Sequence, residues 1–294
     1  MGLDVRAVPQ LPDGFGERFR SGRYDLGDVT LHAVTGGDGP PLLLVGGWPQ
    51  FWWQWRKIMP RLAEDYTVIA VDPRGFGDSD KPETGYDSVT AAGDLARLMT
   101  VLGHERFRVV GHDVGMIISY ALAADHRDRV TGLVLAEAAL PGISDVPSII
   151  PAANRPVEAL WHFMFNRLDS LNERLVEGRE DLYFGEQFRT KGTMPEDVIA
   201  VYVDALRRPG ALHASFQYYR ALDRTIPQNV ERARTPLAIP VLAVGGAGSR
   251  GASVAADVRK VAGQVTELVI DDCGHYVAEE APENFTAAIL DFLA

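Results

Sequence analysis

The sequence predicts an α/β fold in which a mostly parallel, doubly wound sheet carries an inserted helical lid. Short runs rich in Val, Leu and Ile recur along the chain, as expected for parallel strands that are buried on both faces. Helix-length segments separate these runs. The alternation stops for one long stretch in the second half of the chain and resumes near the C-terminus, which indicates an insertion into a single sheet domain.

The expected strands are the apolar runs, and the segments between them supply the crossover helices that parallel strands require. The helices with the clearest pattern are 88–102 and 114–124. We therefore expect a core made of residues 1–141 and 235–294. The apolar runs are Leu42–Gly46, Thr67–Val71, Phe107–Val110, Gly132–Leu135, Val241–Gly245 and Glu267–Ile270.

Residues 142–234 are expected to form the lid, because this stretch has helical patterns and no strand-like runs. Aromatic side chains cluster in it. Most of them are expected to form the core of the lid, and the remainder to line an apolar pocket between lid and sheet. The aromatic residues are Trp161, Phe163, Phe165, Tyr183, Phe184, Phe188, Phe216, Tyr218 and Tyr219.

Composition excludes several classes of partner. The 294 residues carry a formal net charge of -11 and give a pI near 5.1, so nucleic acid and anionic membranes are not expected partners. Cys273 is the one cysteine, so neither an internal disulfide nor a cysteine metal cluster can form. Residues 1–12 lack the pattern of a secretory signal. We expect a cytoplasmic protein without a metal or cofactor.

The segment 107–118 reads FRVVGHDVGMII, a strand, a tight G-x-D-x-G turn and a helix. This is the layout of a nucleophile elbow, with Asp113 where Ser is commoner. Asp113 could instead only cap the helix, as Asp often does. As a nucleophile, its carboxylate needs no base, because it is already ionised at neutral pH. Attack on an sp³ carbon would give an ester that a second step must hydrolyse.

Ester hydrolysis needs a base, and the expected one is His275, which follows the last strand in the segment ELVIDDCGHYVAEE. A histidine base needs a carboxylate to hold its tautomer. Glu137 is the favoured partner because it directly follows the strand after the elbow, at the edge where open α/β sheets place their sites. Asp271 and Asp272 are alternatives, since both are close to His275 in sequence.

Gly46-Gly47-Trp48-Pro49 follows the first expected strand. A loop at this place commonly supplies a backbone N–H that holds negative charge on the oxygen of the nucleophile. Trp48 should provide one such N–H and Val114 the other. The Trp48–Pro49 bond is a candidate for the cis form, as X–Pro bonds in tight turns can be.

With these residues in place, the chain resembles epoxide hydrolases of the α/β-hydrolase superfamily, which implies the α/β-hydrolase fold. The resemblance extends over nearly the whole chain. It includes GHDVG at 111–115, AEAALPG at 136–142, LWHFMF at 160–165, SFQYYRAL at 215–222, and a D-x-R-G-x-G-x-S loop at 72–79. The family usually has His where this chain has Gly46. The resemblance also implies a homodimer.

Epoxide opening leaves a negatively charged oxygen, which needs a hydrogen-bond donor. Most members of the family use two lid tyrosines, and in one bacterial subgroup a histidine replaces one of them. The resemblance assigns these roles to His162 and Tyr219, either of which can donate a hydrogen bond when neutral. Their neighbours Phe163 and Tyr218 are expected to line the pocket. The expected partners are then a small apolar epoxide and water.

Two alternatives remain. A haloacid or haloalkane dehalogenase would use the same aspartate to displace halide. Fluoroacetate dehalogenases typically have Arg after the nucleophile and Trp after the lid His, where this chain has Val114 and Phe163. Haloalkane dehalogenases usually have Trp at the position of Val114. The other alternative is a non-catalytic ligand receptor on the same scaffold, since fold does not imply function. An ordinary esterase would need a Ser or Cys nucleophile.

Overall fold

The computed structural model describes residues 8–145 and 161–294, which build one eight-stranded sheet. The strand order is β1-β2-β4-β3-β5-β6-β7-β8. β2 runs antiparallel to both β1 and β4, and the other neighbouring strands are parallel. The strands are β1 Phe19–Asp25, β2 Thr30–Gly36, β3 Pro41–Val45, β4 Thr67–Asp72, β5 Phe107–His112, β6 Val130–Ala136, β7 Leu237–Gly246 and β8 Ala262–Ile270.

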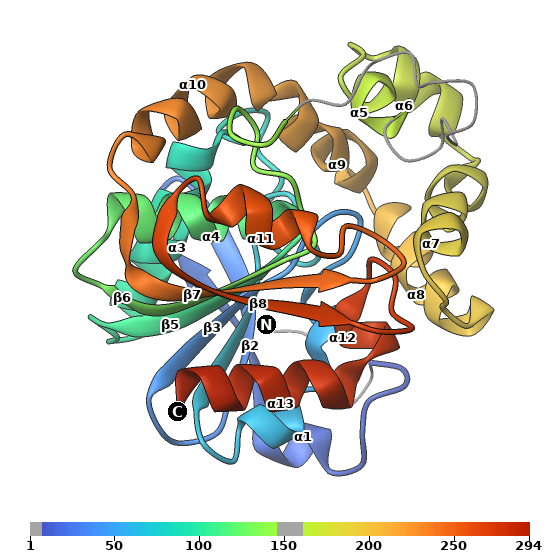
Figure 1. The fold of residues 1–294 in the computed structure, drawn as a ribbon. Coiled ribbons are helices and arrows are strands. Elements are labelled where there is room, and N and C mark those ends of the chain that lie inside the picture. Colours follow the sequence, from blue (N-terminus) through green and yellow to red (C-terminus); the bar gives the residue numbers. More distant parts are fainter. Residues whose placement is uncertain (1–7, 146–160) are drawn as a thin grey trace.

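Helices cover both faces of this sheet, with α3 and α4 on one face and α13 on the other (Figure 1). The central strands β3 to β6 are almost completely buried between these layers, which explains their continuous apolar runs. The helices of the core are α1 Phe15–Arg18, α2 Met59–Leu62, α3 Ser88–Val101, α4 Val114–Asp125, α11 Ser253–Val258, α12 Val277–Glu280 and α13 Pro282–Leu293, with the short 3₁₀ turn η2 Trp52–Trp55.

The predicted mostly parallel sheet with a helical insertion is confirmed, and all of the expected strands are present. The sequence did not indicate β1 and β2. β1 has a half-exposed burial pattern, and it lies at the edge of the sheet, where one side of the strand has no neighbour. Such an edge strand needs no continuous apolar run, so it gives a weak signal in the sequence.

The insertion between β6 and β7 is helical in its described part. Its elements are α5 Trp161–Asn166, α6 Leu171–Val176, η4 Asp181–Gly185, α7 Glu186–Lys191, α8 Glu196–Leu206, α9 Ala211–Arg220 and α10 Leu222–Ala233. Residues 146–160, which the lid expected at 142–234 includes, lie outside the described residues. Phe184, Phe188 and Phe216 are fully buried, whereas Trp161 is 39% exposed. Most of the aromatic cluster is therefore packed inside the protein.

The last inserted helix returns the chain to the core. In α10, Arg232 pairs with Asp125 at the end of α4, with Nη2 2.5 Å from Oδ2. Arg232 also donates to the Ser88 hydroxyl at the start of α3, over 2.6 Å. These contacts attach one end of the insertion to the helices that flank the elbow.

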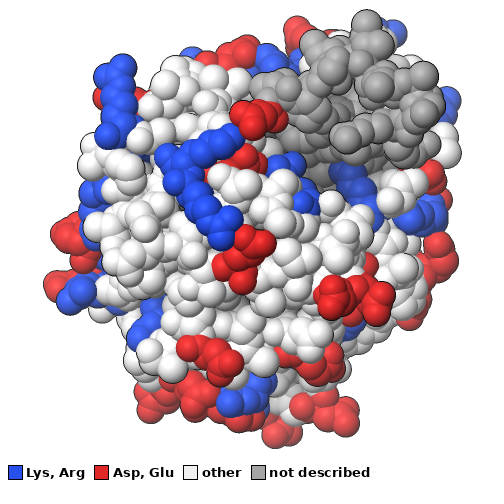
Figure 2. Space-filling view, viewed as in Figure 1, with Lys and Arg blue, Asp and Glu red and all other residues white. Residues whose placement is uncertain are grey.

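The surface mixes charges of both signs. On the face drawn in Figure 2, basic and acidic side chains are interspersed, and acidic ones gather at the lower end of the view. Among the described residues, no helix has the length and apolar character needed to span a bilayer.

Candidate active site

Asp113 lies in the turn between β5 and α4, and its backbone has φ 53° and ψ -123°. The turn is tight on both sides. A Cβ on Gly111 would lie 2.5 Å from the carbonyl oxygen of Gly115, and a Cβ on Gly115 would lie 2.0 Å from that of Val45. Only glycine fits at these two positions. Asp113 occupies the N-cap position of α4, but its side chain makes no capping hydrogen bond, so the carboxylate is free to face the cavity.

The loop after β3 holds one oxygen of this carboxylate. The Trp48 N–H donates to Asp113 Oδ1 over 2.7 Å, and the Trp48–Pro49 bond is cis. The Val114 N–H at the start of α4 also contributes to lowering the pKa of Asp113. Both N–H groups named from the sequence thus act on the same carboxylate.

Gly46 is the position where the related family usually has histidine. A Cβ there would lie 1.9 Å from Nε2 of Gln54, whose side chain is buried. Gln54 therefore occupies the space that a side chain at position 46 would need. The loop keeps its close packing although the histidine is absent.

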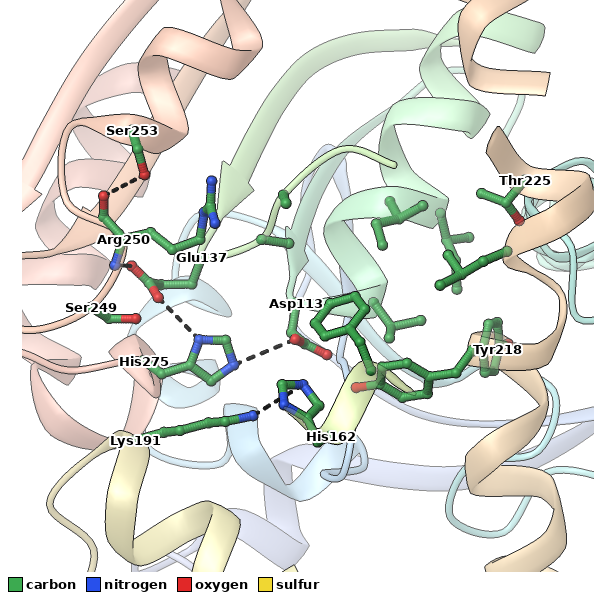
Figure 3. A pocket seen from close by; sticks show the side chains of 18 of the residues that line it. Asp113, Glu137, His162, Lys191, Tyr218, Thr225, Ser249, Arg250, Ser253 and His275 are labelled. Atoms are coloured by element: carbon green, nitrogen blue, oxygen red, sulfur yellow. Dashed lines mark hydrogen bonds and ion pairs between the residues drawn. The ribbon is translucent and has the colours of Figure 1, made fainter. Parts of the chain in front are cut away.

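His275, on the loop between β8 and α12, lies between two carboxylates (Figure 3). Its Nε2 is 3.4 Å from Asp113 Oδ2, and its Nδ1 is 3.0 Å from Glu137 Oε2. Glu137 follows β6 with a positive φ of 58°. Its second oxygen, Oε1, accepts from the Gly246 N–H over 2.7 Å. Glu137 thus reaches His275 at the strand ends, as the sequence suggested.

The sequence rivals of Glu137 do not take this place. Asp271 and Asp272 are exposed, and neither forms an ion pair with His275 in the described structure. Glu137 is 1% exposed, so its charge is desolvated and its effect on His275 is strong.

The protonation of the three residues follows from their contacts. Burial alone would raise the pKa of Asp113, but the hydrogen bond and charge of His275 outweigh it and lower that pKa to about 2. Burial would lower the pKa of His275, but its bonds to Asp113 and Glu137 raise it to about 9. At neutral pH Asp113 is therefore a carboxylate beside a His275 imidazolium.

Two side chains from the insertion complete the site. His162 of α5 stacks on Trp48, with ring centroids 5.5 Å apart and an interplanar angle of 7°. The ring of Tyr219 on α9 stands edge-on to Trp48 at 5.3 Å and to His162 at 5.8 Å. Burial, followed by the charge of Lys191, lowers the pKa of His162 to about 2. Burial raises the pKa of Tyr219 well above its ordinary value. Both side chains are therefore neutral at working pH.

These residues share a cavity of about 630 Å³, a size typical of small-molecule sites. Phe163 and Tyr218 are among the residues that line it. The Tyr218 hydroxyl donates to the carbonyl oxygen of Arg74 over 3.0 Å, so its ring is the part left to face a ligand. Apolar side chains of Ile117, Ile118 and Leu222 line the same cavity, and Thr190, Ser249, Arg250 and Ser253 add polar groups.

Sequence reasoning missed two residues of the site. His112, next to Asp113, donates from Nε2 to the His275 carbonyl oxygen over 2.8 Å and so anchors the loop that carries His275. Lys191, the last residue of α7, places Nζ 3.3 Å from His162 Nε2 and lines the cavity. The GHD sequence offered a weak signal for His112. A lysine at the end of a helix gives none.

One other cluster has the composition of a metal site. Ligand atoms of His32, Asp72 and Asp78 lie within 4.8 Å of one another. His32 Nδ1 is already bonded to Asp72 Oδ2 over 2.7 Å, and Asp72 Oδ1 accepts from the Trp52 N–H over 2.7 Å. These bonds tie β2 and β4 to the loop after β3 and account for the cluster without an ion.

Comparison with known proteins identifies the family of the chain. The alpha/beta hydrolase fold family matches residues 40–282. A soluble epoxide hydrolase from Corynebacterium sp. (strain C12) is 35% identical over 276 residues, covering 90% of this chain and 93% of that protein. A fluoroacetate dehalogenase from Burkholderia sp. is 33% identical over 219 residues, covering 70% of each chain. The crystal structure of Cfl2 wild-type from Burkholderia cenocepacia superposes with a TM-score of 0.90 at 33% identity, covering 98% of both chains.

Proposed function

Because the chain belongs to the alpha/beta hydrolase fold family, we propose that it is an epoxide hydrolase that forms a vicinal diol through an ester on Asp113. The observation that carries this proposal is the state of the Asp113 carboxylate. It is ionised, one oxygen is bound by the Trp48 N–H, and the other is 3.4 Å from His275 Nε2 in a cavity with two neutral donors. This arrangement suits attack on carbon and subsequent hydrolysis.

In the first step, Asp113 Oδ2 attacks a ring carbon of the epoxide and the carbon–oxygen bond breaks. The electron pair moves to the epoxide oxygen, which needs a proton. His162 and Tyr219 are neutral donors that line the cavity beside Asp113, and we assign them this role. The similarity to the Corynebacterium epoxide hydrolase supports the assignment.

In the second step, His275 takes a proton from water and the hydroxide attacks the ester carbonyl. Asp113 Oδ1 becomes the carbonyl oxygen, already bonded to the Trp48 N–H, and the Val114 N–H supports the negative charge that develops. Ester formation also prepares the base. It removes the charge of Asp113, one of the groups that raise the pKa of His275, so His275 can lose its proton and accept one from water.

We further propose that the chain falls in the bacterial subgroup of the cystic fibrosis transmembrane conductance regulator inhibitory factor, which it resembles in its early acid Glu137 and lid residue His162. Residues 142–234 act as the lid of the site, and residues 1–141 and 235–294 act as its base. The substrate is a small epoxide with apolar substituents, in keeping with the apolar side chains around Asp113. A homodimer is proposed from the resemblance alone.

A dehalogenase is the second candidate, favoured by the similarity to the Burkholderia fluoroacetate dehalogenase. The same attack by Asp113 would displace halide in place of the epoxide oxygen. A panel of small epoxides run beside fluoroacetate and a haloalkane separates the two activities through diol and halide release. Binding without release of either product would favour a ligand receptor.

The proposal is tested by removing the base. His275→Gln should form the ester but not hydrolyse it, so an epoxide adduct should accumulate on the peptide that contains Asp113. Mass spectrometry of digested protein detects it. His126→Gln, which changes a histidine outside the cavity, should show no accumulation. An unmodified Asp113 peptide in His275→Gln, under conditions in which the wild type makes diol, would contradict the mechanism.

A further inference from the structure

Lys191 is a cation of the cavity that the two-step mechanism does not use. Its Nζ lies 3.3 Å from His162 Nε2 and 5.4 Å from the centroid of the Trp48 ring. It forms no ion pair with a carboxylate among residues 8–145 and 161–294, whereas Lys57 and Lys260 both do. Figure 3 shows its side chain reaching from α7 to the ring of His162.

The backbone fixes Lys191 relative to the base. Its carbonyl oxygen accepts from the His275 N–H over 2.9 Å. Nearby, Glu280 of α12 accepts from the N–H groups of Thr193, Gly274 and Tyr276 over 3.0, 3.0 and 2.8 Å. The end of α7 is therefore bound to the loop of His275, which fixes the backbone from which the Lys191 side chain reaches His162.

The contact with His162 determines where the histidine carries its proton. A lysine ammonium has no lone pair and can only donate, so Nε2 of His162 must be the acceptor. A neutral imidazole has one N–H, which must then be on Nδ1. Nδ1 is buried and has no partner among the described residues. It belongs to a side chain that lines the cavity with Asp113.

We propose that Lys191 is a positioning residue that holds His162 as the Nδ1–H tautomer and resupplies the proton that His162 gives to the opened epoxide. This proposal rests on the epoxide-opening function proposed above. As Asp113 Oδ2 bonds to carbon and the carbon–oxygen bond breaks, the epoxide oxygen takes the Nδ1 proton. His162 Nε2 takes a proton from Nζ, which leaves a neutral amine on Lys191 and a neutral imidazole.

The proton balance closes in the second step. The proton that His275 takes from water passes to the leaving diol oxygen, and hydrolysis leaves Asp113 as a carboxylic acid. Because the pKa of Asp113 is about 2 in the free enzyme, this acid releases its proton at neutral pH. His162 then takes a proton from solvent at Nδ1 as its Nε2 proton returns to Nζ of Lys191, which restores the starting tautomer. His275 regains from solvent the proton that it lost when the ester formed. Each turnover consumes one epoxide and one water and leaves the enzyme unchanged.

The environment of the ammonium favours release of its proton. His162 of α5 is 3.3 Å from Nζ, and the charge of Asp113 at the elbow acts on it. Tyr219 of α9 and His275 on the loop after β8 line the same cavity. Burial lowers the pKa of Lys191 to about 8, although the charge of Asp113 acts in the opposite direction. Below that pH Lys191 is charged and can donate. Above it the donor is lost, so ester formation should slow as pH rises through about 8.

The tautomer is tested first, without any epoxide. Nitrogen-15 NMR of histidine-labelled enzyme, with the His162 signal assigned by its loss in His162→Gln, should show the proton on Nδ1 at pH 6. In Lys191→Met, which removes the charge and keeps the length, the proton should move at least partly to Nε2. A wild-type signal protonated on Nε2 would overturn the proposal.

The relay is tested in the His275→Gln background, where ester formation is the measured step. Adding Lys191→Met should slow formation of the Asp113 adduct by on the order of 10–100-fold, the range of a lost proton donor when Tyr219 remains. It should also abolish the decline of the rate above pH 8. Lys191→Arg keeps the positive charge but does not release its proton, so it should hold the Nδ1–H tautomer and retain more of the rate than Lys191→Met, without a decline near pH 8. Lys260→Met, which removes a surface lysine, should match the background.

The possible results distinguish a failure of the proposed function from a failure of the relay. If no epoxide modifies His275→Gln, the proposed function fails, and the NMR result still decides the positioning role of Lys191. If the adduct forms at the same rate and with the same pH profile with and without Lys191→Met, the relay is wrong. An effect confined to the KM of carboxylate-bearing epoxides would assign Lys191 to substrate binding and also contradict the relay.

Discussion

The two sides of the cavity are built differently. On the sheet side, Asp113, Glu137 and His275 are held by backbone donors and by one another, with contacts to Trp48 and Gly246 of 2.7 Å each. On the side of the insertion, His162 is held by stacking on Trp48 and by one polar contact to Lys191. The sheet side therefore fixes the proposed nucleophile and base, while the placement of the proposed donors on the insertion depends on packing.

This difference suggests a division of labour in the proposed reaction. In that reaction the insertion supplies the hydrogen-bond donors to the epoxide oxygen during ester formation. The sheet side supplies the base that activates water during ester hydrolysis. Changes on the two sides should then affect different steps, and rapid-mixing measurements that resolve the steps can test the division.

The largest effect is expected on the sheet side from Glu137→Gln. Losing the carboxylate removes the acceptor for His275 Nδ1 at 3.0 Å, so the ring loses its fixed tautomer and its orientation. Ester hydrolysis should fall by about 10²–10⁴-fold, and the ester should accumulate. Asp272→Asn, which changes an exposed acid near the same loop, is the control. Equal slowing of ester formation would argue against the division.

A smaller effect is expected on the side of the insertion from Tyr219→Phe. The change removes one of the two proposed donors to the epoxide oxygen and leaves the ring in place. Ester formation should fall by about 10–100-fold with ester hydrolysis nearly unchanged, as single-turnover kinetics would show. Equal losses in both steps would contradict the donor role.

Tyr218→Phe is the control for Tyr219→Phe. Its hydroxyl bonds to the Arg74 carbonyl over 3.0 Å, so its loss should lower the free energy of unfolding by about 1 kcal/mol. Urea denaturation measures this loss. Neither chemical step should be selectively affected.

The two steps should also differ in their pH dependence without any substitution. The pKa of His275 is about 9 in the free enzyme because the bonds to Asp113 and Glu137 outweigh burial. In the ester the Asp113 charge is gone, so the pKa of His275 is lower. Below that value His275 is protonated and cannot act as a base, so hydrolysis should slow by up to about tenfold per pH unit as pH falls.

Ester formation should not share this decline, because the pKa of Asp113 is about 2 and the nucleophile stays ionised. Single-turnover rates between pH 5 and 8 resolve the two steps. A parallel decline in both would mean that His275 takes part in ester formation.

The same contrast explains what the sequence could predict. The strands β3 to β6 are buried, so their apolar runs were visible in the sequence. Asp113 and Glu137 could be recognised because they follow the ends of two of these strands, β5 and β6. β1 is half exposed and gave no such run. His162 and Tyr219 came from the resemblance alone, since aromatic and histidine side chains in helices are usually core.

The sequence could not predict residues whose role depends on tertiary packing. Gln54 fills the space beside Gly46 that a larger side chain would otherwise occupy. The two residues meet only in the folded chain, so the sequence does not show this contact. Lys191 enters the cavity because α7 ends against the loop of His275. No local pattern records that contact, since it depends on how the insertion packs against the core.

The central claim, a covalent ester on Asp113, is tested most directly by one turnover in water labelled with oxygen-18, with enzyme in excess over epoxide. Hydroxide attacks the ester carbonyl, so the label should enter the Asp113 carboxyl group, and the first diol should carry an unlabelled oxygen from Asp113. Mass spectrometry of the Asp113 peptide and of the diol reads both. A labelled first diol together with an unlabelled peptide would show direct attack of water on the epoxide and contradict the account.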